Sequence, residues 1–159
     1  ETASGQAVSV AFRRESDEEH REPRFELPLP SGPNLVTERG LALIEERIAA
    51  LTEEQSGADE MRATEIAREL RYWNTRRVTA VLAPRPPEDE VAFGSRVRFT
   101  LNGKEQEIVI VGDDEADPAA GKVAFSAPLA RALIGGAADE VVAFNGREDA
   151  ITILDVRPD

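Results

Sequence analysis

The chain has 159 residues, enough for one ordinary domain or two small ones. Its 19 basic and 31 acidic residues give a formal net charge of −12, which excludes broad electrostatic binding of nucleic acid or of an anionic membrane, because either needs a basic face. The absence of cysteine excludes a disulfide framework, and no apolar run approaches the roughly 18–20 residues of a membrane span. These features predict a soluble, cytoplasmic protein.

The first 34 residues are predicted to form a disordered or extended tail. Charged residues dominate positions 13–26, and four prolines between residues 23 and 33 break any helix. The single histidine, His20, lies among acidic residues of this tail. A lone histidine in a solvated acidic run is more often a surface residue than a metal ligand, so no metal site is predicted there.

Residues 35–83 predict an antiparallel helical hairpin. Thr37 is a suitable N-cap, and the first helix is expected to fade at residues 55–57, where serine and glycine disfavour continuation. Apolar residues recur at three- and four-residue steps in both helices: Leu41, Ile44, Ile48 and Leu51 in the first, and Ile66, Leu70 and Trp73 in the second. Two narrow stripes of this kind can bury each other, and the second helix is expected to stop at Pro84.

The polar and aromatic residues of the second helix have separate expected roles. Trp73 is expected in the core of the hairpin, and Tyr72 is expected to pack toward the C-terminal region. Four arginines are expected to form a solvated, ion-paired face, with contacts to acidic partner surfaces as the alternative: Arg68, Arg71, Arg76 and Arg77.

A proline-rich and acidic linker at residues 84–90 precedes a region whose period changes to two. Alternation over residues 96–101, followed by the turn sequence Asn102-Gly103, predicts a β-hairpin that returns at residues 108–111. Residues 91–159 are therefore predicted to form a separate small sheet domain.

Four further elements follow the acidic loop at residues 112–118. They are a short strand at 123–125, a brief helix that begins at Pro128, and a last hairpin from 140–144 and 150–156. The predicted class is thus α+β: an N-terminal antiparallel helical hairpin, or short coiled coil, followed by a mostly antiparallel sheet with one short helix.

The acidic cluster at residues 113–117 invites comparison with a calcium-binding loop. Such a loop needs a glycine at its sixth position and a bidentate glutamate at its twelfth, which is occupied here by Ala124. A solvated loop or a polar surface for a partner is expected instead.

Four segments in this order and spacing resemble the Gre transcript-cleavage factors of bacterial RNA polymerase (GreA/GreB type). They are residues 34–40 (NLVTERG), 91–95 (VAFGS), 110–117 (IVGDDEAD) and 126–135 (SAPLARALIG). The resemblance implies a C-terminal domain of FKBP-like fold that docks on the rim of the polymerase secondary channel. It also implies that the coiled coil enters the channel.

The resemblance implies a partner-binding surface formed by Asp113, Asp114, Glu115, Asp117, Ser126, Pro128 and Leu129. The simpler alternative is that Pro128 merely begins a helix and that Leu129 fills the core. The expected role is a monomeric transcription factor that modulates elongation, with bacterial RNA polymerase as its partner and no sequence-specific contact to nucleic acid.

The hairpin tip departs from the family pattern. The factors that the chain resembles carry an Asp-x-x-Glu-Asn motif there, which helps to hold a second catalytic Mg²⁺ in the polymerase, and their hairpins are longer. Here the nearest acids are Asp59 and Glu60, and a first helix of 18 residues (37–54) spans only about 27 Å. An arm that falls short cannot share a metal site, so efficient stimulation of transcript cleavage is not expected, and the protein itself needs no cofactor.

Two alternatives remain open. Asp59 and Glu60 can be functional tip acids of an active cleavage factor, or exposed turn residues. An FKBP-like domain can also be a prolyl isomerase, an enzyme that needs an aromatic apolar cleft, for which this region offers only Phe93, Phe99, Phe125 and Phe144. The predicted short helical hairpin with a small sheet domain also resembles the short-armed Gre-related class of nucleoside diphosphate kinase regulators.

Overall fold

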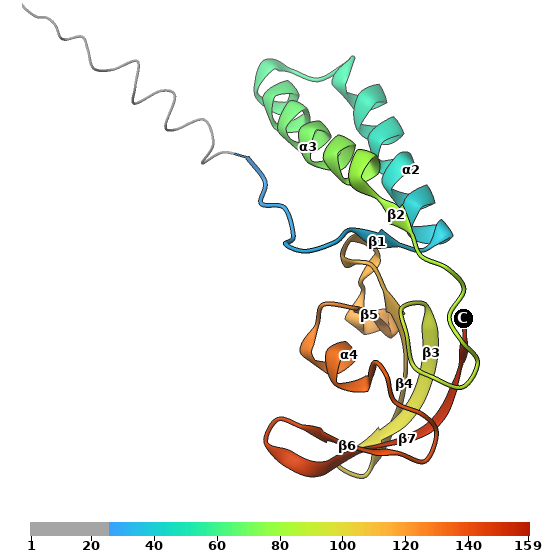
Figure 1. Ribbon diagram of the computed structural model, residues 1–159. Coiled ribbons are helices and arrows are strands. Elements are labelled where there is room, and N and C mark those ends of the chain that lie inside the picture. Colours follow the sequence, from blue (N-terminus) through green and yellow to red (C-terminus); the bar gives the residue numbers. More distant parts are fainter. Residues whose placement is uncertain (1–25) are drawn as a thin grey trace, which may run out of the picture.

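The computed structural model describes residues 26–159, which form a helical arm mounted on a sheet (Figure 1). The predicted α+β class is confirmed, with the helical hairpin first and the sheet with one short α-helix after it. His20 and most of the predicted tail lie outside the described residues. Within residues 26–159, neither long helix combines the length and apolarity that crossing a membrane would require.

The arm consists of α2 (Glu38–Gln55) and α3 (Glu60–Thr79). Thr37 caps α2, because its hydroxyl accepts the main-chain N–H of Gly40 at 2.9 Å. The predicted apolar stripe is confirmed at its centre, where Ile44, Leu51 and Ile66 are at most 1% exposed. The two helices therefore stabilise each other through a narrow aliphatic seam.

A two-stranded parallel sheet closes the base of the arm. β1 (Leu35–Val36) precedes α2 and pairs with β2 (Val81–Leu82), which follows α3. The main-chain N–H of Val81 donates to the Asn34 carbonyl at 2.9 Å. The second helix thus ends at Thr79 and not at the predicted Pro84, because the chain turns into a strand whose partner is distant in sequence.

The C-terminal sheet has five strands in the order β5-β4-β3-β7-β6. Its strands are β3 (Ser95–Leu101), β4 (Lys104–Val111), β5 (Lys122–Ala124), β6 (Val141–Phe144) and β7 (Arg147–Pro158). All pairs are antiparallel except β4 with β5, so the predicted mostly antiparallel sheet is confirmed with one parallel pair. Asn102 and Asn145 have positive φ, as do the glycines that follow them, which fits the two predicted tight turns.

One face of this sheet carries the core. α4 (Pro128–Leu133) contributes Ala130 and Leu133 to it, and Phe99 at its centre is fully buried. Two short 3₁₀ turns, η1 (Asp113–Glu115) and η2 (Pro118–Ala120), lie between β4 and β5. Since η1 contacts both β1 and α2, the acidic loop forms the joint between sheet and arm.

Candidate functional site

The two predicted tip acids lie at the turn between α2 and α3. Asp59 is the N-cap of α3, and its carboxylate accepts the main-chain N–H of Arg62 at 2.8 Å. Glu60 follows as the first helical residue and is exposed. One of the two carboxylates is therefore already engaged in holding the helix end.

Three other acids near the tip converge on one arginine. The Arg62 guanidinium reaches Glu54 at 2.7 Å, and Glu65 and Glu69 at 3.1 Å each. The hydrogen bond from Arg62 lowers the pKa of Glu54, whereas hydrogen bonds to Glu54 and then Glu65 raise the pKa of Arg62. This cluster ties α2 to α3 and removes these acids from any role as free metal ligands.

Replacement of the cap tests its structural role. Asp59→Ala is expected to lower the free energy of unfolding by about 1 kcal/mol, because the first turn of α3 loses an acceptor for an otherwise unpaired N–H. Asp59→Asn is expected to leave the stability nearly unchanged, since asparagine caps as well as aspartate does. Urea unfolding followed by circular dichroism measures both variants, and equal losses would contradict the capping role.

The acidic loop divides into residues that face the arm and residues that face solvent. Glu115 is 5% exposed, although it is a carboxylate in a loop. It accepts the Thr37 hydroxyl at 2.6 Å and the Arg39 Nε–H at 2.9 Å. A buried carboxylate needs such partners, and here both come from the start of α2.

Asp114 makes the second contact to the arm. Its carboxylate accepts the Tyr72 hydroxyl at 2.5 Å and the Arg76 Nε–H at 2.6 Å. The side chain of Arg76 is 4% exposed and that of Asp114 is 9% exposed, so this is a buried ion pair. Burial, together with the hydrogen bond to Asp114, raises the pKa of Tyr72. The expected packing of Tyr72 toward the sheet is confirmed by this contact, and Arg76 does not belong to the predicted solvated face.

The carboxylates of Asp114 and Glu115 are therefore bonded to the arm and do not belong to an exposed partner-binding surface. The other predicted residues of that surface remain candidates. Asp113 accepts the Ser126 hydroxyl at 2.6 Å, which brings the loop next to the start of α4. Ser126, Pro128 and Asp117 are exposed. Leu129 is half-buried against the core, which agrees with its simpler role in packing.

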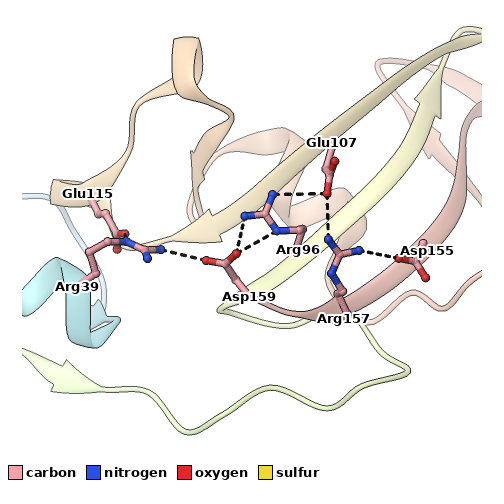
Figure 2. Close-up of polar contacts among 7 residues, drawn as sticks. All are labelled: Arg39, Arg96, Glu107, Glu115, Asp155, Arg157 and Asp159. Carbon is pink, nitrogen blue, oxygen red and sulfur yellow. Dashed lines mark hydrogen bonds and ion pairs between the residues drawn. The ribbon is translucent and has the colours of Figure 1, made fainter.

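An alternating chain of charges continues from this joint across the open face of the sheet (Figure 2). Arg39 of α2 contacts Glu115 and, at 3.0 Å, Asp159. Arg96 of β3 contacts the same Asp159 at 2.6 Å. Although burial opposes the charged form, hydrogen bonds from Arg39 and Arg96 keep the pKa of Asp159 below its ordinary value. The row of ion pairs continues from Arg96 to Glu107, from Glu107 to Arg157 and from Arg157 to Asp155.

The lowered pKa of Asp159 predicts a pH-dependent contribution to stability. Asp159→Asn is expected to cost less than about 1 kcal/mol at pH 7, because both arginine partners retain solvent contact. A depressed folded-state pKa stabilises above the unfolded pKa of about 3.9, and the effect is lost as the pH falls through the folded value. Urea unfolding of both proteins from pH 7 to pH 2 should therefore show the difference shrink as the pH falls below the unfolded value of about 3.9. A difference that persists at pH 2 would contradict this assignment.

Two glycines permit the close approach of loop and arm. A Cβ on Gly112 would lie 2.4 Å from the Leu35 carbonyl oxygen of β1, and one on Gly40 would lie 2.9 Å from Glu115 Oε1. Side chains at these positions would push the loop away from the arm. The joint thus depends on small residues as well as on charges.

Apart from Tyr72, sequence reasoning did not find the residues on the arm side of this joint. Arg39, Arg76 and Asn34 are involved, the last through its side-chain N–H donated to the Arg76 carbonyl at 2.8 Å. A signal was nevertheless present, because residues 34–40 and 110–117 were both distinctive segments. The structure shows that these two segments meet.

Among residues 26–159, no three histidine or acidic side chains gather in a way that could hold a metal ion. Phe99 is buried, Phe125 and Phe144 pack against the core, and Phe93 lies edge-on to Phe125 with ring centroids 5.4 Å apart. These phenylalanines serve mainly the core of the sheet.

The fold and the joint define a two-part α+β protein in which a helical arm is fixed to a sheet domain. Residues 86–158 match the family described as "Transcription elongation factor, GreA/GreB, C-term". These residues are similar to that family, and the resemblance noted in the sequence is confirmed.

Relatives that align with part of this chain are named transcription elongation factors. GreB of Neisseria meningitidis is 39% identical over 102 residues, which cover 60% of this chain and 62% of that protein. GreA of Halalkalibacterium halodurans is 39% identical over 71 residues, which cover 42% of this chain and 45% of that protein. The chain thus spans about half to three fifths of the length of these curated relatives.

Solved structures give a weaker similarity. Gfh1 of Thermus aquaticus is 14% identical with a TM-score of 0.39, over 80% of this chain and 99% of that chain. A similarity of this size supports no argument about how the arm is placed.

Proposed function

We propose that this protein is a Gre-type transcription factor that binds bacterial RNA polymerase in the cytoplasm. The C-terminal domain docks on the rim of the secondary channel, and the helical arm enters the channel. The family match of residues 86–158 and the names of the relatives support the class of partner. The protein acts by occupying the channel, and the polymerase supplies all chemistry.

The observation that carries this proposal is the buried joint between arm and sheet. The ion pair of Arg76 with Asp114 and the contacts of Glu115 fix the arm to the docking domain at two points on η1. An arm attached by a free linker would have no defined direction. An arm fixed in this way is pre-organised, so docking of the sheet domain also aims the arm at little further entropic cost.

The docking surface is formed by Asp113, Ser126 and Pro128. Asp113 belongs to η1, which contacts the arm, and the hydrogen bond of Ser126 to Asp113 holds the loop and the start of the helix together. The charge of Asp113 and the exposure of Ser126 and Pro128 suit a reversible contact with a rim of opposite charge.

The arm modulates elongation without efficient stimulation of cleavage. Helices of 18 and 20 residues span about 27 and 30 Å, respectively. A carboxylate must lie about 2.0–2.5 Å from a metal ion to bind it, so even a small deficit in reach excludes coordination. The cap role of Asp59 further reduces what the tip can offer a metal.

Co-elution with bacterial RNA polymerase in gel filtration at low salt tests the binding. Wild-type protein is expected to co-elute, and Asp113→Arg is expected to weaken binding at least about tenfold by reversing a charge on the docking surface. Glu148→Arg makes the same charge change on an exposed residue near the turn between β6 and β7, and it should bind as wild type does. A wild-type protein that elutes separately from polymerase would refute the proposal.

Backtracked transcription complexes test the expected lack of cleavage. Adding the wild-type protein should not shorten the RNA beyond the intrinsic rate, while it should compete with a longer-armed cleavage factor. If RNA does shorten, the double variant Asp59→Asn/Glu60→Gln decides the cause, because it keeps the helix cap but removes both tip charges. Loss of cleavage in this variant would establish the alternative of an active factor.

A further inference from the structure

A cavity of about 440 Å³ lies between the base of the arm, the linker and the sheet. Its lining includes Arg39 of α2, Arg85 and Pro86 of the linker, and Phe93. A second cavity of about 310 Å³ shares Arg39 with the first and adds Arg96 and Lys122. Both border on the ion pair of Arg39 with Asp159. Ligand pockets are commonly found at such junctions, with volumes of roughly 300–1,000 Å³.

The charge of this junction differs from that of the rest of the chain. The two cavities together are lined by four cations, Arg39, Arg85, Arg96 and Lys122, and by three carboxylates, Glu38, Glu107 and Asp159. The whole chain has 19 basic and 31 acidic residues. Cations thus outnumber carboxylates by one among these lining residues, whereas carboxylates outnumber cations by 12 in the whole chain, so an anion meets less repulsion here than elsewhere on the protein.

Several donors in the cavities remain available. Within residues 26–159, the side chains of Arg85 and Lys122 make no ion pair or hydrogen bond. Arg39 donates from Nε to Glu115 and from Nη2 to Asp159, and its side chain is 52% exposed. An arginine with free guanidinium N–H groups binds phosphate through charge-assisted hydrogen bonds.

The wall next to these donors is apolar. Pro84, Pro86 and Phe93 line the first cavity, and the edge-on contact with Phe125 at 5.4 Å fixes the ring of Phe93. An aromatic ring beside proline offers a surface for a flat apolar group. The cavity thus combines an aromatic and proline wall with the guanidinium of Arg85, which is unpaired within the described residues, and the remaining N–H groups of Arg39.

We infer that this junction binds a small organic anion of the nucleotide class. The flat base lies against Phe93 and Pro86, and the phosphates accept hydrogen bonds from Arg85 and Arg39. This inference does not rest on the proposed binding to polymerase, because it concerns the isolated chain alone.

Calorimetric titration of the full chain with ADP tests the inference, with adenosine and pyrophosphate as the two partial ligands. ADP is expected to bind at least about tenfold more tightly than either, since each retains only one of the two recognised groups. Arg85→Gln is expected to weaken ADP at least about tenfold through the lost phosphate contact. Arg131→Gln is the matched control, because Arg131 is exposed on α4 and its side chain makes no hydrogen bond or ion pair within residues 26–159.

Phe93→Leu separates the two parts of the site. It should weaken ADP but leave pyrophosphate unchanged, because only the base contacts the ring. The inference is overturned if ADP does not bind at millimolar concentration, if pyrophosphate binds as tightly as ADP, or if Arg85→Gln and Arg131→Gln lose affinity equally.

Discussion

Asp114→Ala is expected to lower the free energy of unfolding by about 3–5 kcal/mol, because it leaves the buried guanidinium of Arg76 without its counter-ion. The Arg76 side chain is 4% exposed and cannot turn to solvent without separating the arm from η1. Tyr72 loses its hydrogen-bond acceptor in the same variant. Urea unfolding at pH 7, monitored by circular dichroism and by the fluorescence of Trp73, measures the loss.

The double variant Asp114→Ala/Arg76→Met provides the decisive comparison. It removes both charges together, so it should recover a large part of the stability that the single variant loses. Asp113→Ala is the matched control, since Asp113 is the neighbouring acid and, within residues 26–159, its side chain bonds only to the exposed Ser126. It should change the stability by no more than about 0.5 kcal/mol. A double variant as unstable as Asp114→Ala would show that the pair is not the cause.

Gly112→Ala is expected to cost about 1–3 kcal/mol, although alanine is only one methyl group larger. The new Cβ would lie 2.4 Å from the Leu35 carbonyl oxygen, and this atom belongs to the backbone of β1, which cannot rotate away as a side chain can. The loop must therefore retreat from the arm. Thermal unfolding and amide hydrogen exchange of β1 should both register the change.

Gly57→Ala is the control for this substitution. Gly57 lies at the tip of the arm, where a Cβ would meet no atom within 4 Å. Because alanine restricts the unfolded chain, the variant should be neutral or slightly stabilising. Equal losses of stability in Gly112→Ala and Gly57→Ala would mean that the loss arises from reduced backbone flexibility and not from a clash with β1.

Much of the fold could be predicted because its signals are local. Thr37 and the serine and glycine at residues 56–57 mark the two ends of α2, and the structure places the helix at Glu38–Gln55. The sequences Asn102-Gly103 and Asn145-Gly146 likewise mark two turns with positive φ. In each case a few neighbouring residues determine the backbone conformation.

Most contacts of the joint could not be predicted, because they join residues that are far apart in the sequence. A stripe of three- and four-residue steps on α3 leads from Trp73 to position 77, yet the buried residue is Arg76. Its burial depends on Asp114, which lies 38 positions away. The same holds for the end of α3, where pairing with Leu35 replaces further helix. A single sequence does not show such pairs. The predicted partner-binding surface therefore included Asp114 and Glu115, which belong to the joint.

The pairing of β1 with β2 holds the segment before α2 beside the segment after α3, so that both ends of the arm lie at the same place. Ser56 and Gly57 at the far end are exposed. Inserting or deleting one helical turn in both helices would change the length of the arm by about 5.4 Å and leave its mounting intact. The length of the arm and the firmness of its attachment to the sheet domain are thus separate properties, and each can change without the other.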